Sequence, residues 1–270
     1  MGTRPCLLPR YSRPVTPLGA LPITEYAMKR LILAAACAFA LVACSNPEEE
    51  RKAQEAAAAA AKAQQEEKAE GVAKQYEMAV AAQDWERARI HGGALLDQYK
   101  DTDVAARIEP GFAEVQAKGD AARDLRRMQG LWQYNQIPVG SKGMQVSAQI
   151  YSKQRVDVDG SGAKPVQLVF RDHPEWKRHA YLVLQAGDFR CPQCKVQVSV
   201  DGGKPIAMAA WRPKTDEAIA MFITDQKALW KLARKAKVIS IEFPVKAGGT
   251  RTAVFETGGV DPNRMPKWWE

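Results

Sequence analysis

Apolar and polar residues alternate along much of the second half of the chain, the pattern of strands that bury one face. In the clearest unit, Val196, Val198 and Val200 fall on one face, and Ile206–Ala210 continues the alternation on a facing strand. Asp201-Gly202-Gly203 between them is a strong hairpin signal. Further strands are predicted at Val146–Tyr151, Val166–Phe170, Ala180–Leu184, Ala218–Ile223, Val238–Phe243 and Thr252–Phe255.

One helix interrupts this series of strands. Asp225–Lys235 carries Leu229, Trp230 and Leu232 among charged residues, which predicts a helix with one apolar side. Residues 131–270 are therefore expected to form an antiparallel β-sandwich or partly open barrel with one inserted helix. Such a sheet has one face on a core and the other on solvent.

The pattern changes to helical spacing in residues 71–130. Gln83-Asp84 ends a first helix, and Asp101-Thr102-Asp103 can cap a third. Pro110 and Gly111 are a candidate interruption of that third helix, which continues as a charged segment over 121–131. The fold class expected for the whole chain is α+β, with this helical segment preceding the β-rich domain.

Residues 44–70 contain a polar tract rich in Ala, Glu, Lys and Gln, which are strong helix formers. The tract has no sustained apolar stripe, so a helix there would have nothing to bury. Two interpretations remain open, a semi-rigid helical tether and a disordered segment. Both make the tract a spacer.

A secretory signal begins at Met28. Lys29 and Arg30 precede an apolar run, Leu31–Val42, which ends in small residues. The run is too short for a membrane-spanning helix, which needs about 20 apolar residues.

The end of this run, Leu41-Val42-Ala43-Cys44, resembles the lipobox of bacterial lipoprotein precursors. The resemblance implies that the Cys44 thiol is diacylated, that the chain is cleaved before Cys44 and that the new amino terminus is acylated. Acyl chains would then hold the protein on a membrane. Ser45, in place of the aspartate that retains such proteins at the inner membrane, favours the outer membrane. An ordinary signal peptide with a chance cysteine is the alternative.

Lipoprotein signals rarely follow a proline-rich preface, so residues 1–27 are interpreted as a mis-assigned start, with translation beginning at Met28. The expected organisation is this start (1–27), a signal peptide (28–43), a tether (44–70), a helical segment (71–130) and a β-rich domain (131–270).

Residues 79–108 resemble a tetratricopeptide-type helical hairpin, with small residues at Ala81, Ala82 and Ala88 and with Trp85 and Tyr99 filling the gaps. The resemblance covers about one repeat, whereas a solenoid needs roughly three. A small helical bundle is the preferred interpretation, and partner binding in a helical groove is the other.

The formal charge of +8 overstates the basicity of the mature chain. Residues 1–43 hold five of the 39 basic residues and one of the 31 acidic ones, so 34 basic and 30 acidic residues remain from Cys44 onward. Nucleic-acid binding needs Lys and Arg clustered on one face or helix. The sequence predicts no such cluster and no nucleic-acid partner.

Cys191 and Cys194 form a Cys-x-x-Cys pair, the densest motif in the chain. In an exported protein such a pair is expected to be oxidised. A structural disulfide at the mouth of the hairpin is preferred to a thiol–disulfide exchange site, because a strand and not an activating helix follows Cys194. Two cysteines do not complete a zinc site, and no metal or cofactor is predicted.

Catalytic candidates are weak. His173 and His179 flank a charged turn that is expected to be solvated, and the acidic loop Asp157–Gly162 lacks the bidentate glutamate of a calcium loop. No serine elbow, zinc-binding helix, phosphate loop or dinucleotide fingerprint occurs. No catalytic residue is assigned, and the chain is not predicted to be an enzyme.

The tryptophans divide into two groups. Trp132, Trp211 and Trp230 are expected in the core. Trp268 and Trp269, at the end of the chain, are harder to bury, and they either dock back onto the sheet or contact a partner.

These features predict a lipid-anchored lipoprotein of the outer membrane of a Gram-negative bacterium, facing the periplasm. Its membrane contact is the anchor, and its leading role is non-catalytic binding or assembly with an envelope protein or the cell wall. One alternative is an inhibitor or immunity lipoprotein that blocks a periplasmic enzyme. The other is a thiol–disulfide enzyme that uses Cys191 and Cys194.

Overall fold

The computed structural model describes residues 46–214 and 219–268. The lipobox with Cys44, the signal peptide and Trp269 lie outside these residues. The chain separates into two compact units, residues 1–64 and 65–270. No helix in the described residues is both long enough and apolar enough to cross a membrane.

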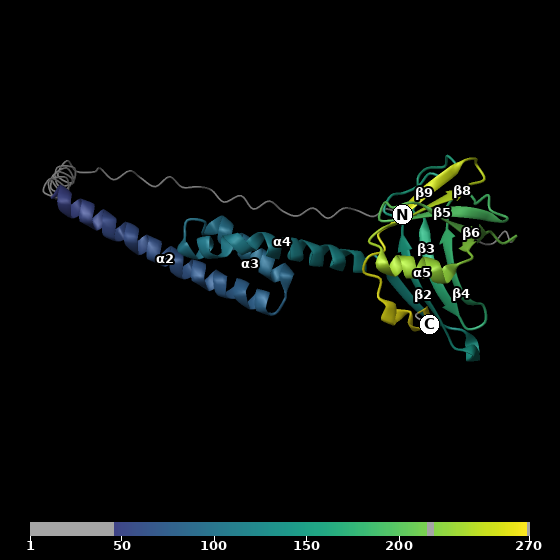
Figure 1. The fold of residues 1–270 in the computed structure, drawn as a ribbon, viewed down its shortest axis with the longest axis horizontal. Helices are drawn as coiled ribbons and strands as arrows, with labels where there is room; N and C mark the ends of the chain where they lie inside the picture. The colour runs from purple at the N-terminus through teal and green to yellow at the C-terminus, as the bar shows by residue number, and fades with distance from the viewer. Residues whose placement is uncertain (1–45, 215–218, 269–270) are drawn as a thin grey trace, which may run out of the picture. The chain divides into compact units, whose positions relative to one another are not determined.

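The polar tract is helical. Helix α2 covers Pro47–Ala81 (Figure 1), and every residue in 47–65 is exposed. Ion pairs between Glu48 and Lys52 and between Arg51 and Glu55 join successive turns. The sequence left helix and disorder open, and the structure shows the helix.

Two more helices complete a small bundle with the second half of α2. Helix α3 is Trp85–Gln98 and helix α4 is Asp103–Gln129. The Asp84 carboxylate accepts a hydrogen bond from Arg87 N at 3.2 Å, and the Thr102 hydroxyl accepts one from Ala105 N at 3.2 Å. The apolar cluster of the bundle comprises Ala69, Ala73, Tyr76, Ala79, Ala88, Leu95, Val104, Ile108 and Val115.

The expected interruption at Pro110 does not occur, because α4 runs unbroken through it. Proline removes one backbone hydrogen bond from a helix. Packing of Ile108 and Val115, on either side of the proline, into the bundle outweighs that loss.

The rest of the chain forms one nine-stranded antiparallel sheet in the order β1-β2-β3-β4-β7-β6-β5-β8-β9. The strands are β1 (Gln133–Pro138), β2 (Met144–Tyr151), β3 (Gln167–His173), β4 (Lys177–Val183), β5 (Cys194–Val200), β6 (Ile206–Trp211), β7 (Ala220–Ile223), β8 (Ile239–Pro244) and β9 (Thr250–Phe255). Strand β1 was not predicted, because five of its six residues are exposed and no alternation marks it.

The sheet curls, so that strands distant in its order come together. Lys153 N, just after β2, donates to Val254 O in β9 at 2.7 Å. Helix α5 (Gln226–Lys235) lies across the strands (Figure 1) and buries Leu229, Trp230 and Ala233 against the inner face of the sheet. The predicted fold class is confirmed: helices first, then an antiparallel sheet with one inserted helix.

The predicted hairpin between β5 and β6 is also confirmed. Val196 pairs with Met208 and Val198 with Ile206. Asp201 has φ +48° and Gly202 has φ +76°, the left-handed backbone that this tight turn requires. The Asp201 carboxylate also accepts hydrogen bonds from Lys237 N and Val238 N, which ties the turn to the start of β8.

Candidate functional site

The face of the sheet that points away from the core carries a row of aromatic rings and one arginine. In register, Tyr181 on β4 lies beside Phe222 on β7, and Phe222 lies beside Trp211 on β6. Arg171 on β3 lies beside His179 on β4. We call this set, completed by Trp176 from the β3–β4 turn, the aromatic–arginine face; its members are Arg171, Trp176, His179, Tyr181, Trp211 and Phe222.

The rings of this face pack against one another. Trp211 stacks on Phe222 with ring centroids 4.9 Å apart, and the centroid of Tyr181 lies 5.0 Å from that of Phe222. His179 meets the Phe222 ring edge-on at 5.4 Å. Trp211 is nonetheless 40% exposed and Trp176 is 59% exposed. The rings are therefore held by neighbours and still offer surface to solvent.

Arg171 lies between two of these rings. Its guanidinium carbon is 5.2 Å from the centroid of Trp176 and 5.3 Å from that of Tyr181, within the range of cation–π attraction. Its Nε atom is buried and has no hydrogen-bond partner, and neither has Nδ1 of His179. No carboxylate in the described part of the chain forms an ion pair with Arg171. A half-buried guanidinium without an anion is an energetically costly arrangement.

The burial of Tyr181 and His179 and their proximity to Arg171 determine the direction in which their pKa values shift. Burial raises the pKa of Tyr181, while attraction to Arg171 acts in the opposite direction. Burial and repulsion from Arg171 lower the pKa of His179. His179 is therefore neutral at pH 7, and Arg171 is the fixed positive charge among the six residues of the face.

His173 positions Trp176. Its Nδ1 accepts hydrogen bonds from Glu175 N at 3.1 Å and Trp176 N at 3.2 Å. Its ring stacks on Trp176 at 4.0 Å with an interplanar angle of 12°. The sequence predicted a solvated turn here, which is wrong for His173, because this packing buries it to 4% exposure.

The expectation that Trp211 lies in the core is also wrong. Trp132 is 5% exposed and Trp230 is 1% exposed, as predicted, but Trp211 points to the opposite side of the sheet from the core. Alternation along β6 contained the signal, since Met208 and Ala210 are inward and residue 211 must then be outward. Arg171, Tyr181 and Phe222 come together only through the order of strands in the sheet, and no sequence motif connects them.

The two cysteines form a disulfide, Cys191–Cys194. Cys191 is 1% exposed, and its carbonyl accepts a hydrogen bond from Arg212 N at 2.6 Å. Cys194 is the first residue of β5, so a strand and not a helix N-terminus follows the pair. This environment lacks the exposed, activated sulfur of a disulfide-exchange enzyme.

Asp188, three residues before Cys191 in the sequence, forms ion pairs with Arg212 and Lys246. Asp188 Oδ1 accepts from Arg212 Nε at 2.5 Å, and Asp188 Oδ2 lies 2.6 Å from Lys246 Nζ. Burial raises the pKa of Asp188, but hydrogen bonds from Lys246 and Arg212 outweigh it and leave the pKa below its usual value. The carboxylate is thus ionised and fully paired, which makes it structural.

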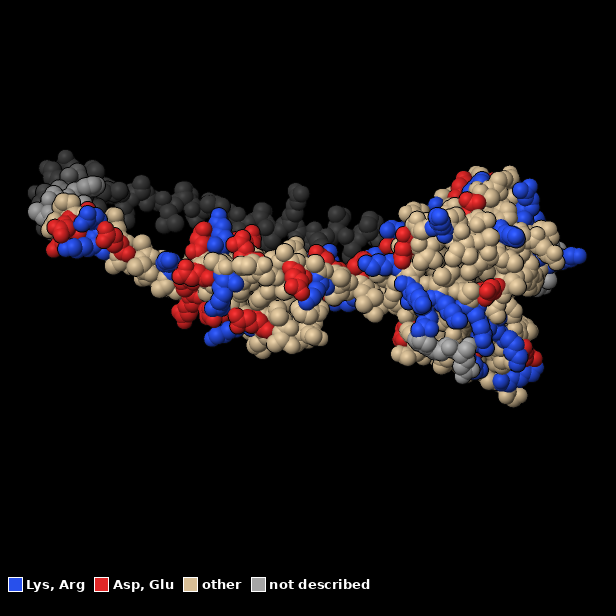
Figure 2. Space-filling view, viewed as in Figure 1, with Lys and Arg blue, Asp and Glu red and all other residues tan. Residues whose placement is uncertain are grey.

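Helix α5 presents a basic side to solvent, where Lys and Arg gather in Figure 2. Lys227, Lys231, Arg234 and Lys235 are exposed and recur at three- and four-residue spacing. The prediction that no helix carries clustered basic residues is therefore wrong. The cluster belongs to a wider asymmetry, since residues 131–270 hold 21 basic and 13 acidic residues.

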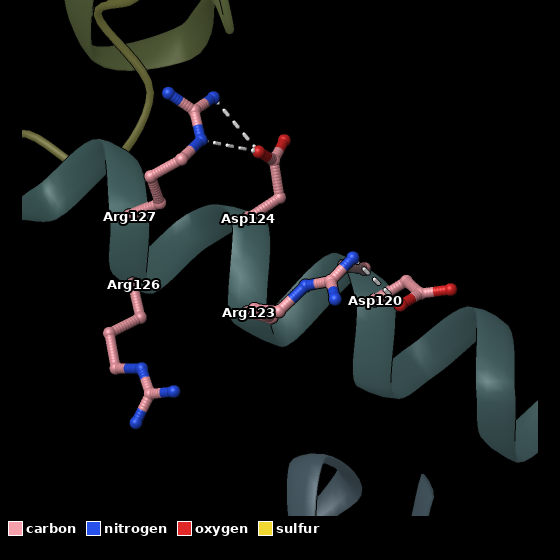
Figure 3. Close-up of a pocket in the computed structure, with 6 residues that line it drawn as sticks. Asp120, Arg123, Asp124, Arg126 and Arg127 are labelled. Carbon is pink, nitrogen blue, oxygen red and sulfur yellow. Dashed lines mark hydrogen bonds and ion pairs between the residues drawn. The ribbon is translucent and has the colours of Figure 1, made fainter. Parts of the chain in front are cut away.

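A hollow of about 820 Å³ lies along α4, lined by Asp120, Ala121, Arg123, Asp124, Arg126 and Arg127. Figure 3 shows that its charges pair within the helix: Arg123 with Asp120 at 3.1 Å and Arg127 with Asp124 at 2.9 Å. Arg126 pairs with Glu86 of α3. These charges are satisfied by their neighbours, so the hollow is a weaker ligand site than the aromatic–arginine face.

The aspartates of the acidic loop at 157–162 accept hydrogen bonds from backbone N–H groups of the same loop. Asp157 accepts from Gly160 N at 2.7 Å, and Asp159 accepts from Ser161 N at 3.0 Å. These are turn hydrogen bonds. Within residues 46–214 and 219–268, no group of three or more His, Cys, Asp or Glu side chains could hold a metal ion.

Trp268 lies in the core, 4% exposed, with its ring centroid 5.5 Å from that of Phe170 and 5.4 Å from that of Trp230. Of the two predicted alternatives, docking onto the sheet is the one that the structure shows for Trp268. Trp269 and the lipidation residue Cys44 lie outside the described residues.

Comparison with known proteins adds little. No protein-family model matches this chain, and no curated protein matches it. Among solved structures, the chain is similar to the crystal structure of invasion associated protein b from Bartonella henselae, with 15% identity, covering 52% of this chain and 92% of that one. The TM-score is 0.34, which is too low to carry an argument about fold or function.

Proposed function

We propose that this protein is a lipid-anchored lipoprotein of the bacterial envelope that acts by binding and not by catalysis. The binding surface is the aromatic–arginine face of the sheet. The partner is a component of the envelope, either a protein or the cell wall.

One observation carries the binding role. Arg171 lies between Trp176 and Tyr181, beside exposed tryptophan rings, and no carboxylate within residues 46–214 and 219–268 pairs with it. Tryptophan, tyrosine and arginine contribute most of the energy in many interfaces. Here their rings are fixed by stacking before any partner arrives, which lowers the entropy cost of binding.

The lipobox at Leu41–Cys44 supports the anchor, and the exposed first half of α2 suits a spacer. Residues 47–64 as a helix measure about 27 Å at 1.5 Å per residue. In this proposal these residues are the spacer that follows the acylated Cys44 in the chain.

The other two roles have less support. Burial of Cys191 and the strand after Cys194 argue against thiol–disulfide exchange. An inhibitor or immunity role uses the same kind of surface, because it is also binding. It differs only in the partner, a periplasmic enzyme.

Hydroxyl-radical footprinting tests the proposal on the unaltered protein. Oxidation of Trp211 and Trp176 is compared between native membranes and the purified full chain in detergent. Met144 and Met78, which are 45% and 65% exposed, are the controls. We expect protection of both tryptophans in membranes with no change at either methionine. Equal oxidation of the tryptophans in the two samples would contradict binding at this face.

A further inference from the structure

We propose that the ligand of the aromatic–arginine face is a saccharide chain that carries carboxylate groups. This inference rests on the proposed function, because it names the chemical class of the ligand that the same face takes.

The charge of Arg171 is the first feature of the face that points to this ligand. Arg171 is held half-buried by two rings, its Nε atom has no partner, and no described carboxylate pairs with it. A guanidinium presents a fork of N–H donors that matches the two oxygens of a carboxylate. On β3 and β4, Arg171 is cross-strand to His179, whose buried Nδ1 is also unpartnered. Among the residues that the structure describes, Arg171 therefore lacks an anion, which a ligand can supply.

The acidic residues described next to Arg171 in the chain do not fill this place. Glu175 in the β3–β4 turn forms an ion pair with Lys142. Asp172, next to Arg171 in the strand, points to the other side of the sheet and lies 3.7 Å from Lys267. The excess of basic residues in 131–270 adds a favourable long-range field for an anionic ligand.

The second feature is the shape of the aromatic surface. Neighbouring strands lie about 4.8 Å apart, so the four adjacent strands that carry this face, from β3 with Arg171 to β6 with Trp211, span roughly 14 Å. Although the rings pack against one another, Trp211 and Trp176 remain 40% and 59% exposed, so two separate tryptophan surfaces are open to a linear chain of several units. The negative face of an aromatic ring attracts the partially positive C–H groups of a sugar ring.

The third feature is the polar border of the face. Gln149 lies in the same cross-strand row as Val169 and Tyr181, and its amide donates to Gln133 Oε1 at 2.9 Å. Gln133 is exposed. Amides and hydroxyls can exchange hydrogen bonds with sugar hydroxyls. The amides at this border can therefore hydrogen-bond the hydroxyl groups of a saccharide that extends past the aromatic rings.

The test uses the full chain in detergent and peptide-free glycan strands, whose lactyl groups end in carboxylates. The matched probe is the same strands with those carboxylates converted to amides. Isothermal titration gives the dissociation constant of each variant for each probe. We expect the unmodified strands to bind about tenfold more tightly than the amidated strands, since a charge-assisted pair contributes on the order of 1.4 kcal/mol.

The variants separate charge from stacking. Arg171→Gln should remove the preference for carboxylated strands while leaving the affinity for amidated strands unchanged. Trp211→Ala should weaken binding of both probes by a similar factor. Arg155→Gln, an exposed arginine elsewhere, and Lys231→Gln, on the basic side of α5, should change neither.

Three results would overturn the inference. The wild type could bind carboxylated and amidated strands equally well, Arg155→Gln could lose as much affinity for carboxylated strands as Arg171→Gln, or only Lys231→Gln could lose affinity. If Arg171→Gln does not fold, titration of the wild-type chain followed by NMR decides instead. The indole N–H signals of Trp211 and Trp176 should then shift with carboxylated strands before those of buried Trp230, and their lack of movement would contradict the inference.

The two proposals fail differently. Protection of Trp211 in membranes without binding to either glycan probe would overturn the saccharide and leave the binding role, with a protein as the occupant. If Trp211 and Trp176 are oxidised equally in membranes and in detergent, the binding role itself is contradicted.

Discussion

Arg127, near the end of α4, holds Glu256, just after β9, through two parallel hydrogen bonds. Arg127 Nη1 donates to Glu256 Oε2 at 3.0 Å, and Arg127 Nη2 donates to Oε1 at 2.9 Å. Lys153 Nζ also lies 3.1 Å from Glu256 Oε1. Glu256 is only 9% exposed, and this pair lies where the helical bundle meets the sheet.

The ion pair predicts a pH-dependent stability. Hydrogen bonding to Arg127 lowers the pKa of Glu256 below its usual 4.5, although burial acts against this. A carboxylate whose pKa is lower in the folded state stabilises the fold above its unfolded pKa, and the contribution is lost as pH falls through the folded value. Glu256→Gln should therefore lower the melting temperature at pH 7 by about 2–4 °C, as expected for roughly 1 kcal/mol.

The difference between wild type and Glu256→Gln should shrink as the pH falls below 4.5, and it should be lost as the pH passes through the lowered pKa of Glu256 in the folded state. Differential scanning calorimetry from pH 7 to pH 3 measures it. Glu242→Gln, an exposed glutamate on β8, is the control and should show no such trend. A difference that stays constant with pH would contradict a role for the ionised carboxylate.

The disulfide predicts a modest contribution to stability and no enzymatic turnover. Cys191 and Cys194 are three positions apart, and closing so small a loop stabilises the fold by about 2 kcal/mol in the chain-entropy relation. Cys194→Ser should lower the melting temperature by about 4–8 °C, as should reduction of the wild type. Turnover in a disulfide-reduction assay that Cys191→Ser abolishes would overturn the structural role.

The helical bundle predicts opposite effects for two glycines of one helix. A Cβ at Gly119 would lie 2.6 Å from Trp85 O and 2.6 Å from Arg89 Cβ, so α3 and α4 would have to separate. Gly119→Ala should destabilise the chain by about 1–3 kcal/mol. Gly111→Ala meets nothing within 4 Å and should stabilise it by about 0.5–1 kcal/mol, the helix propensity of alanine over glycine.

Chemical denaturation of the two glycine variants and the wild type measures both effects. No effect of Gly119→Ala would show that α3 and α4 do not pack as closely as the structure places them. Destabilisation by Gly111→Ala would contradict the open helical surface at that position.

The anchor predicts a definite mass. The chain extracted from membranes should match acylated Cys44–Glu270, and two alkylatable thiols should appear only after reduction. Intact mass spectrometry with and without reduction measures both. An unacylated mass, or a peptide from residues 5–25 detected in cells, would contradict the lipobox and the start at Met28.

Strand positions were predictable where alternation and turn residues agreed. Val196–Val200 and the turn at Asp201-Gly202-Gly203 determine one hairpin, and the structure reproduces its register. The pattern failed at β1, whose residues are mostly exposed, and at Pro110, where packing on both sides overrides local propensity.

The candidate site was less predictable than the fold, because it depends on the order of strands in the sheet. Arg171, Tyr181, Phe222 and Trp211 lie on four strands whose adjacency, β3-β4-β7-β6, does not follow chain order. Each residue alone has an ordinary explanation. The large apolar side chain of Trp211 favoured the core. The alternation along β6, in which Met208 and Ala210 face inward, instead puts Trp211 on the outer face.

The central claim, that the aromatic–arginine face contacts an envelope component, is tested most directly by photo-crosslinking in intact cells. A photoreactive phenylalanine replaces Trp211 in one strain and Ile206 in another. Ile206 is on the same strand, is 48% exposed and faces the opposite side. We predict adducts of the full chain from position 211 and none from position 206. Adducts from position 206 alone, or none from position 211, would contradict the claim.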